Sequence, residues 1–516
     1  MKEQTICQSS APSRATAIAR LTDGVLDLLI VGGGIVGSGV ARDAALRGLR
    51  VGLVEQQDFA FGTSSRSSRL LHGGLRYLAQ GRVGLVHEAS VEKKVVHHIA
   101  PHLAEPLPFI FPTYRHNRNW VLWQLKIGVK IYDLLCGGRN LGNSSWMTAR
   151  ELLAKVPGLS QQDLTGAVRY YDGFTNDARL TLDTLRSASL AGGVVLNYCR
   201  FLDAKRTDLW ECDLHDMLAD REVKVRARAV VNATGPWADG LPHSRVKLRV
   251  TKGVHLVVDR ARVPVPETVV MTEGKRILFA IPWGERTILG TTDTDYSGPL
   301  DDIHADAGDI QYVLGVANQF FPEARLTAAD VISSWAGVRP LIADPNGNPS
   351  DISRSHEIRS PEPGWWDVAG GKLTTYRLMA EQTVDQVVKW LARENRAFAG
   401  AKPCRTAQEP LLPPDQVTGV SGILPPECNR RVVEHFCARE WAVHLDDVML
   451  RRSSWHYYHR DARQLAERTA DWMAELLGWS KDTRAAELER YARATCQGSR
   501  PPGNRAEACS TALSRS

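Results

Sequence analysis

The sequence lacks several patterns that would place the protein in a specialised class. None of its nine cysteines forms a Cys-x-x-Cys pair, so neither a disulfide framework nor a zinc or other metal site is indicated, and a reducing compartment fits best. No window approaches the roughly 20 consecutive apolar residues of a transmembrane helix, so any membrane association would be peripheral. The net charge of +6 is small for 516 residues. It does not indicate nucleic-acid binding, although it permits contact with an acidic membrane or an anionic substrate.

The amino-terminal segment also lacks a continuous apolar stretch of the signal-peptide type. It contains Arg14 and Arg20, as transit peptides do, but also Glu3 and Asp23. We therefore expect residues 1–24 to form a disordered extension. The whole chain has 43% hydrophobic and 24% charged residues, which is ordinary for a soluble globular protein. Its length predicts two or three domains.

The most informative stretch is Asp27–Glu55. Leu28–Val31 is a short apolar run typical of a buried strand. A G-x-G-x-x-G turn follows directly at residues 32–37, and a helical pattern then leads to a second apolar run, Val51–Val54, which ends at Glu55. A G-x-G-x-x-G motif alone is weak evidence, but here strand, glycines, helix, strand and acid occur in register.

Each part of this stretch suits a dinucleotide. Gly32 permits a tight turn, Gly34 lets a pyrophosphate approach the backbone, and Gly37 lets helix and strand pack closely. The helix amino terminus offers N–H groups and a partial positive charge to the phosphates. Glu55 stands where a carboxylate accepts hydrogen bonds from the adenosine ribose, and it disfavours a 2′-phosphate. The stretch therefore predicts a site for FAD or NAD rather than NADP.

Two motifs follow this stretch. The hydroxyl-rich run at residues 63–68 offers donors for phosphates or ribitol hydroxyls, although such a run is equally often a solvated loop. In His72-Gly-Gly-Leu-Arg-Tyr77, the glycines permit close approach to a flat ring. Arg76 supplies a planar fork suited to phosphate or carboxylate.

The remaining chain alternates helical and strand patterns. The periodicity predicts helices over residues 86–100, 120–135, 180–191, 377–392 and 463–477, and strands over residues 194–198, 247–258, 276–282 and 287–290. The last two strands read as a hairpin about Gly284-Glu285 in a mainly antiparallel sheet. The 120–135 helix mixes Trp, Leu, Ile and Val with Lys126 and Lys130. A packed domain helix is the favoured reading of it, and a membrane-surface helix is the alternative.

Several further motifs occur in a fixed order: Ala-Pro-His-Leu at 100–103, Asp-Ala-Arg-Leu at 177–180, Asn-Ala-Thr-Gly-Pro-Trp at 232–237, Gly-Thr-Thr-Asp at 290–293, Gly-Val-Arg-Pro at 337–340 and Gly-Gly-Lys-Leu-Thr-Thr-Tyr at 370–376. With the motifs above, they resemble the FAD-dependent glycerol-3-phosphate dehydrogenase family, within the wider D-amino-acid-oxidase-like flavoproteins. The resemblance covers about residues 27–392. The chain after Pro426 is not matched motif by motif.

The resemblance implies an α/β fold with a Rossmann-like FAD-binding domain, a mainly antiparallel substrate domain and a short helical C-terminal region. We expect the following division: residues 25–115, 165–242 and 331–400 in the FAD-binding domain, 116–164 and 243–330 in the substrate domain, 401–426 as a linker and 427–516 as the helical region.

The implied activity is the oxidation of sn-glycerol 3-phosphate to dihydroxyacetone phosphate by hydride transfer to flavin N5, with electrons passed to a quinone. Oxygen as acceptor and another polyol phosphate or hydroxy acid as substrate remain alternatives, as does, more remotely, a non-catalytic flavin-binding protein. The expected location is cytoplasmic. Peripheral contact with the inner face of the membrane and a homodimer stay open.

The resemblance also implies roles for individual residues. Arg76 and Arg339, helped by Tyr77, would bind the phosphate, His255 would take the hydroxyl proton, and Lys372 would stabilise negative charge. His72 is an alternative base, whereas Asp293 is expected only to order its turn. His255 could instead be an ordinary core histidine, and Arg339 a structural ion pair. The implied FAD contacts are Gly32, Gly34, Ile35, Val36, Gly37, Glu55, Gln56, Thr63, Ser64, Ser65, His72, Gly73, Gly74, Leu75, Ala233, Thr234, Gly235, Trp237, Gly371, Lys372, Leu373 and Thr374.

Overall fold

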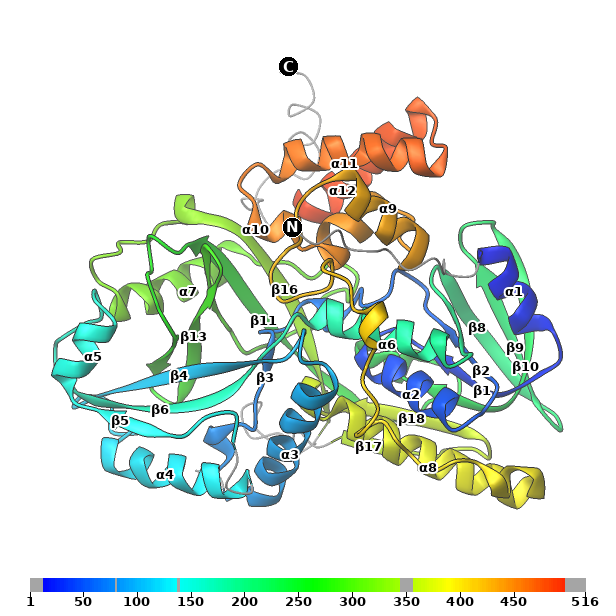
Figure 1. Ribbon diagram of the computed structural model, residues 1–516, viewed down its shortest axis with the longest axis horizontal. Coiled ribbons are helices and arrows are strands. Elements are labelled where there is room, and N and C mark those ends of the chain that lie inside the picture. The colour runs from blue at the N-terminus through cyan, green and yellow to red at the C-terminus, as the bar shows by residue number, and fades with distance from the viewer. Residues whose placement is uncertain (1–12, 79–80, 137–139, 344–355, 497–516) are drawn as a thin grey trace.

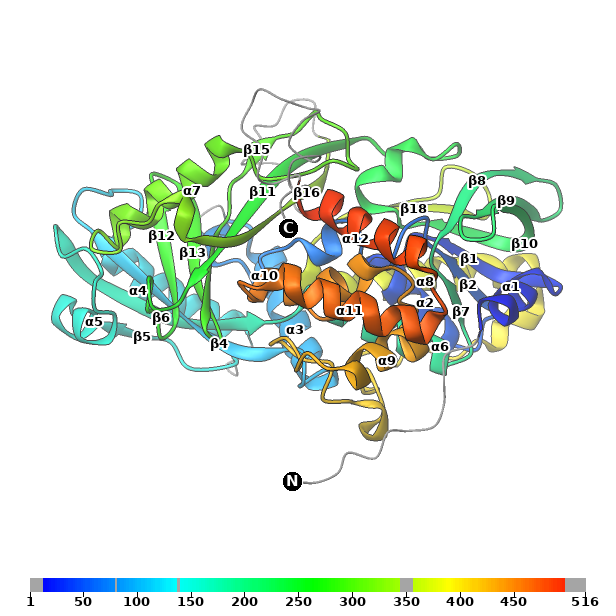
Figure 2. The same cartoon turned by 90° about the horizontal axis from the view of Figure 1, so that it is seen from above.

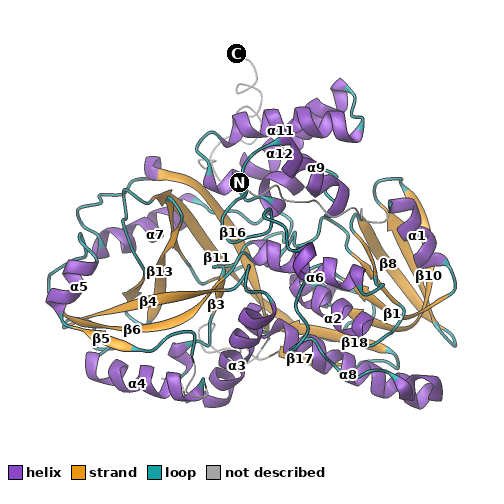
Figure 3. Cartoon of the chain, in the orientation of Figure 1, coloured by secondary structure: helices purple, strands orange, loops and turns teal. Residues whose placement is uncertain are grey.

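A computed structural model describes residues 13–78, 81–136, 140–343 and 356–496, without the side chains of Arg76 and Cys496. Two sheets lie side by side, and the C-terminal helices lie across the top of both (Figures 1 and 3). The predicted α/β class, with a parallel sheet, a mainly antiparallel sheet and a helical C-terminal region, is confirmed.

The first sheet has the Rossmann-like order β17-β18-β10-β1-β2-β7. Its strands are β17 (His356–Arg359), β18 (Trp365–Gly370), β10 (Arg221–Asn232), β1 (Val25–Val31), β2 (Val51–Val54) and β7 (Val194–Leu196). The pairs from β18 to β7 are parallel, while β8 (Cys199–Arg206) and β9 (Trp210–Asp216) extend β10 as an antiparallel hairpin. The parallel order brings the carboxyl ends of β10, β1 and β2 together.

Helices cover both faces of this sheet. On one face, Leu28 and Ile30 pack with α2 (Ile35–Leu46), α6 (Asp177–Leu190) and α8 (Tyr376–Glu394). On the other face, Leu29 and Val31 pack with α1 (Arg14–Thr22). The continuous apolar run in β1 exists because both of its faces are buried.

The second sheet has the order β15-β11-β14-β13-β12-β4-β6-β3, with β16 paired to β11 and β5 to β6. Its strands are β15 (Thr294–Asp295), β11 (Leu248–Asp259), β14 (Arg286–Gly290), β13 (Arg276–Trp283), β12 (Thr268–Glu273), β4 (Glu105–Tyr114), β6 (Leu164–Phe174), β3 (Leu70–Leu71), β16 (Val331–Ile342) and β5 (Ser145–Met147). β13 and β14 form the predicted hairpin.

Helices also cover this second sheet. α7 (Ala307–Phe320) packs on one face, and α3 (Val83–Ile99) and α4 (Leu122–Leu135) pack on the other. α5 (Ala149–Lys155) adds to the first of these faces. Short 3-10 turns connect the elements: η1 (Thr63–Ser65), η2 (Leu75–Tyr77), η3 (Gly235–Gly240), η4 (Ala328–Asp330), η5 (Leu373–Thr375), η6 (Arg396–Gly400) and η7 (Pro414–Gln416).

The C-terminal region, residues 427–496 of the described chain, has its own apolar core. It contains α9 (Arg430–Arg439), the π-helix η8 (Asp447–Arg452), α10 (Trp455–Tyr458), α11 (Ala462–Leu477) and α12 (Lys481–Cys496). Seen from above, α11 and α12 run across the middle of the molecule (Figure 2). The region touches the second sheet where Tyr458 OH accepts a hydrogen bond from the Glu285 amide at 2.9 Å.

Two sequence predictions need correction here. Residues 1–24 are not a disordered extension throughout, because residues 14–22 form α1, capped by Ser13. This helix buries Ala17, Ile18 and Leu21 against the first sheet, and Arg14 donates to Asp216 at 2.5 Å. The rest of the extension, residues 1–12, lies outside the described residues.

The expected domain boundaries also do not match the way the strands are divided between the two sheets. β3, β4, β6 and β16 fall in segments expected for the FAD-binding domain, yet all four belong to the second sheet. Strand pairing over long sequence separations decides this membership, and local patterns do not report it. The 401–426 segment is not a free linker either, because Leu411 is fully buried and packs with residues of α3 and α6.

Candidate active site

A single cavity of about 1420 Å³ is lined by both sheets. From the first sheet it is lined by residues that follow β1, β2 and β10, including Gly32, Glu55 and Ala233. From the second sheet it is lined by β11 and β16, which contribute His255 and Arg339. Pockets for ordinary small ligands measure about 300–1,000 Å³. The cavity can therefore hold a dinucleotide and a small substrate together.

At the first-sheet end, side chains hold the glycine turn in place. The Glu55 carboxylate accepts hydrogen bonds from the backbone N–H of Gly33 at 2.7 Å and of Gln57 at 2.9 Å. Ser64 Oγ accepts one from the N–H of Ile35, the first residue of α2, at 2.9 Å. Burial raises the pKa of Glu55. The acid thus faces the cavity and also braces the turn.

The turn also fits the predicted roles of its glycines. Gly32 has a φ of +112°, in the region that favours glycine. A Cβ on Gly37 would lie 1.9 Å from the carbonyl oxygen of Gly32, so only glycine lets α2 start so close to β1. The amino end of α2 opens beside the cavity, where Gly34 and Ile35 line the wall. This arrangement fits a pyrophosphate group.

His255 lies at the second-sheet end and is 2% exposed. Its Nε2 is 2.8 Å from Ser68 Oγ, and its ring stacks on Trp335 with centroids 5.2 Å apart. Nδ1 is buried without a hydrogen-bond partner among the described residues. Burial, with further contributions from Arg339 and Arg69, lowers the pKa of His255 to about 3. The imidazole is therefore neutral near neutral pH.

Arg339 projects from β16 into the same cavity. Its guanidinium donates to Asp293 Oδ1 at 3.2 Å, to the Thr292 carbonyl at 3.3 Å and to Thr291 Oγ1 at 3.2 Å. Gly253 faces it from β11, where a Cβ would lie 2.7 Å from Nη2. Asp293, expected only to order its turn, thus also orients a cavity-lining cation.

Lys372 and Tyr77 also meet in the cavity wall. Lys372 Nζ lies 4.2 Å from the centroid of the Tyr77 ring, and both residues line the cavity. The 72–74 segment is tied to η5 because the His72 N–H donates to Thr374 Oγ1 at 3.0 Å. Two motifs about 300 residues apart thus form one wall. The side chain of Arg76 lies outside the described part of the structure.

Most of the predicted FAD contacts line the cavity: Gly32, Gly34, Ile35, Val36, Glu55, Gln56, Thr63, Ser64, His72, Gly74, Leu75, Ala233, Thr234, Gly235, Trp237, Gly371, Lys372, Leu373 and Thr374. Gly37, Ser65 and Gly73 are not among the lining residues. Ser65 is buried, and the Gly73 N–H donates to Tyr132 OH at 2.9 Å. All of these residues remain predicted FAD contacts. The structure shows which of them line the cavity.

Two of the cavity residues that sequence reasoning missed stand out, Ser68 and Arg66. Ser68 contacts His255, as described above, and Arg66 lines the cavity with its guanidinium 5.3 Å from the Phe61 ring. No hydrogen bond or ion pair joins the Arg66 side chain to other described residues, and burial lowers its pKa. Both lie in the hydroxyl-rich run at 63–68, where a single cation among hydroxyls is the signal that could have identified Arg66.

Comparison with known proteins agrees with this geometry. Residues 27–386 match the family model described as FAD dependent oxidoreductase. An aerobic glycerol-3-phosphate dehydrogenase of Bacillus subtilis is 40% identical over 412 residues, covering 78% of this chain and 74% of that protein. The chain belongs to the FAD-dependent oxidoreductase family. Within the family it groups with glycerol-3-phosphate dehydrogenases and alpha-glycerophosphate oxidases, and its cofactor is FAD.

Other relatives extend the match. Glycerol-3-phosphate dehydrogenase 2 of Mycobacterium bovis is 36% identical and covers 92% of this chain and 88% of that protein. An alpha-glycerophosphate oxidase of Streptococcus pyogenes is also 36% identical, covering 75% of this chain and 74% of that protein. The solved glycerol-3-phosphate dehydrogenase of Bacillus halodurans, complexed with FAD, has a TM-score of 0.77 at 28% identity, covering 96% of this chain and 99% of that one.

The comparison corrects one sequence interpretation. Residues 426–484 match the model described as the C-terminal domain of alpha-glycerophosphate oxidase, whereas no family motif was identified after Pro426 from the sequence. The helices α9 and α11 of this region are amphipathic, and neither contains a glycine motif of the kind that identified the rest of the chain.

The lowered pKa of His255 makes a prediction about stability. The unfolded chain binds a proton at this residue near pH 6.5, and the folded protein only near pH 3. The contribution of the neutral ring to the free energy of unfolding is therefore complete above pH 6.5 and is lost as pH falls from 6.5 towards 3. At pH 5 the loss is about 2 kcal/mol. We expect the Tm of His255→Gln to fall less than that of the wild type between about pH 7 and pH 5. Parallel Tm curves would contradict the shift.

Proposed function

We propose that this protein oxidises sn-glycerol 3-phosphate to dihydroxyacetone phosphate, using FAD. The observation that carries the proposal is that one cavity joins the glycine turn and Glu55 to a neutral histidine and a fork-shaped cation, His255 and Arg339. The names of the dehydrogenase and oxidase relatives support the choice of substrate.

In this proposal the second-sheet wall binds and deprotonates the substrate. Arg339, held by Asp293, binds the phosphate through charge-assisted hydrogen bonds, and Arg66 adds a second cation in the same cavity. Arg76 remains a sequence-based candidate for the same group. His255 Nε2 is a hydrogen-bond acceptor when Ser68 donates to it, so the substrate hydroxyl can replace Ser68 and pass its proton there.

The cofactor supplies the oxidising power. When bound, the flavin of FAD accepts the hydride that leaves the carbon bearing the hydroxyl. Lys372, beside Tyr77, places a positive charge in the cavity wall that would stabilise the developing alkoxide or the reduced ring. The buried location of His255 excludes water from the proton acceptor.

For the electron acceptor we propose a quinone, with oxygen as the second candidate because several relatives are named as oxidases. A quinone dissolved in a membrane requires a surface that reaches the lipid. Among the helices within the described ranges, none is long and apolar enough to cross a membrane. We propose that the contact is peripheral.

The outer face of α4 suits such contact. Trp123, Ile127, Ile131 and Leu134 project outward at helical spacing and are between 44% and 73% exposed. α4 lies below β5 and β6 at the lower left of Figure 1, on the outside of the molecule. Lys126 Nζ lies 3.9 Å from the ring centroid of Trp146, which is itself exposed, so cationic charge borders the apolar stripe. An apolar stripe bordered by lysines matches an anionic lipid surface.

The first test is anaerobic addition of sn-glycerol 3-phosphate to the FAD-loaded protein. We expect rapid loss of the oxidised flavin absorbance near roughly 450 nm. Glyceraldehyde 3-phosphate, lactate and glycerol serve as substrate controls. Flavin that stays oxidised with sn-glycerol 3-phosphate would contradict the substrate, and flavin that no compound bleaches would support a non-catalytic flavoprotein. Reoxidation by a soluble quinone but not by air would support the quinone, and stoichiometric peroxide would support oxygen.

The phosphate clamp is tested with Arg339→Ala. Removing a cation that binds a buried anion costs about 2 kcal/mol or more, so we expect kcat/KM for sn-glycerol 3-phosphate to fall roughly 30-fold or more, with FAD retained. Arg339→Lys keeps the charge but loses the fork and should be intermediate. Arg262→Ala is the control, because Arg262 pairs with Asp330 outside the cavity. Normal kinetics in Arg339→Ala would refute the clamp.

The α4 surface is tested by vesicle sedimentation with anionic phosphatidylglycerol vesicles. Each of Ile127→Glu and Leu134→Glu should weaken binding roughly tenfold, since each removes apolar burial worth about 1.5–3 kcal/mol and adds a repelled charge. Leu190→Glu, at an exposed leucine of α6 outside the cavity wall, is the matched control. Equal binding by all three variants would mean that the lipid contact lies elsewhere. If neither the variants nor the wild type bind the vesicles, the proposed lipid contact is wrong.

A further inference from the structure

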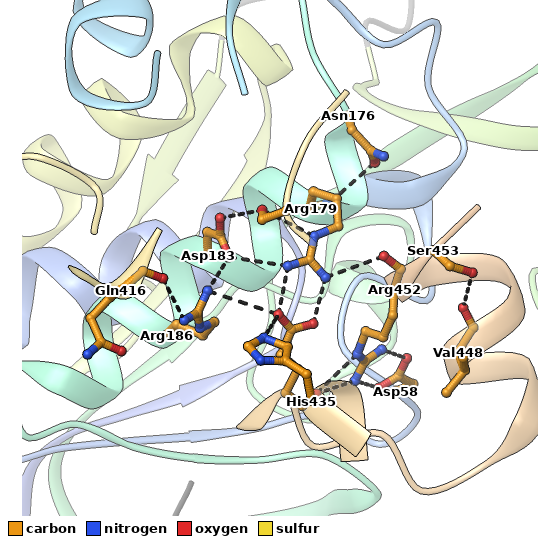
Figure 4. Close-up of polar contacts among 12 residues, drawn as sticks. Asp58, Asn176, Arg179, Asp183, Arg186, Gln416, His435, Val448, Arg452 and Ser453 are labelled. Atoms are coloured by element: carbon orange, nitrogen blue, oxygen red, sulfur yellow. Dashed lines mark hydrogen bonds and ion pairs between the residues drawn. The ribbon is translucent and has the colours of Figure 1, made fainter. Parts of the chain in front are cut away.

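A network of buried charged side chains joins the C-terminal region to the first sheet (Figure 4). Asp58 lies in the segment between β2 and η1, and its carboxylate is fully buried. Arg451 Nε donates to Asp58 Oδ2 at 2.5 Å. Arg452 donates to both carboxylate oxygens, with Nη2 at 2.8 Å from Oδ1. Consecutive arginines of the π-helix η8 thus bind one carboxylate.

A second arm of the network reaches α6. Arg179 donates to both oxygens of Glu440, at 2.6 and 2.7 Å, and both side chains are buried. His435 Nε2 lies 3.1 Å from the same carboxylate. Arg452 also donates to the Glu440 carbonyl at 2.7 Å, so one arginine connects the two arms.

The network holds the segment that builds the first-sheet end of the cavity. Asp58 stands between Glu55 and Ser64, the two side chains that brace the glycine turn. Within the same segment, the Ala60 N–H donates to the Gly33 carbonyl at 3.1 Å. At the far end, the Ser67 N–H donates to Asp177 of α6 at 2.9 Å. Residues 55–67, which we name the cofactor segment, are therefore anchored at Asp58 and at Ser67.

The anchoring at Asp58 depends on the C-terminal region. Burial alone would raise the pKa of Asp58, but Arg452 and Arg451 lower it below its ordinary value. A buried carboxylate without such partners is strongly destabilised. Asn197 also donates to Asp58, at 3.2 Å, but it is uncharged. Among the described residues, the cations paired with Asp58 come from η8 alone. The C-terminal region must be docked for the cofactor segment to keep this place.

We infer that the C-terminal region is part of the FAD site. Arg451 and Arg452 act as positioning residues, because they hold the cofactor segment through Asp58 without touching the cavity themselves. FAD affinity then depends on residues almost 400 positions away in the chain. The alternative is that the network stabilises the fold only.

The test is the dissociation constant of FAD for the full-length apoprotein, followed by flavin fluorescence without substrate. We expect Asp58→Asn and Arg452→Met to raise the Kd about tenfold or more, as for a coupling of this kind between two sites. Glu267→Gln is the matched control. Glu267 is a buried carboxylate with two cationic partners, Lys155 at 2.8 Å and Arg169 at 2.7 Å, and lies outside the cavity wall. It should lower the Tm and leave the FAD Kd within about twofold.

The outcomes separate the two explanations. An unchanged Kd in Asp58→Asn and Arg452→Met, with a lowered Tm, would overturn the inference and leave a purely structural network. If these variants do not fold, Arg452→Lys takes their place, since it keeps the charge and loses the fork. A raised FAD Kd in Arg452→Lys would support the inference, and an unchanged Kd would overturn the inference. Because no substrate is present, failure of the proposed glycerol-3-phosphate activity leaves this result unaffected.

Discussion

A buried carboxylate needs cations or hydrogen-bond donors around it, and arginines meet this need where the C-terminal helices dock. Asp58 is paired with Arg451 and Arg452, and Glu440 with Arg179. These pairs join the C-terminal helices to the first sheet and to α6. Separating the helices from the cofactor segment would leave these carboxylates buried without their cations, so the pairs favour one mutual arrangement of the two.

At the second-sheet end of the cavity, the charged side chains are paired differently. There, no acid forms an ion pair with Arg66 among the described residues, whereas Arg339 is paired with Asp293. A cation without a paired acid favours an anionic ligand, while burial, with smaller contributions from Arg339 and Arg69, lowers the pKa of His255 and keeps the ring neutral. In our proposal, this wall of the cavity both binds the phosphate and keeps a proton acceptor available.

The two sheets contribute different groups to the cavity wall because one presents strand ends and the other presents a face. Parallel strands β10, β1 and β2 bring their carboxyl ends together and present backbone N–H groups and Glu55. Antiparallel strands β11 and β16 present alternate side chains from one face, which places Gly253 and His255 opposite Gly337 and Trp335. In our proposal, the cavity between these strand ends and this sheet face receives FAD on one side and the substrate on the other.

The sequence by itself determined what depends on short-range spacing. The glycine turn, its flanking strands and Glu55 could be predicted because the whole unit lies within about 30 residues. Arg339 and Lys372 stand in two of the short motifs that carry the resemblance, at residues 337–340 and 370–376, whereas His255 lies in the predicted strand 247–258 and was proposed from the resemblance alone.

Only the tertiary structure decided what depends on distant partners. β4, β6 and β16 joined the second sheet through pairings over long separations. Residues 14–22 became an ordered helix because the first sheet offered an apolar face. The role of Asp58 could not be read locally, because an acid next to Phe59 looks like any loop residue until η8 brings two arginines to it. Burial and charge pairing between remote segments are properties of the fold, and no local pattern in the chain records them.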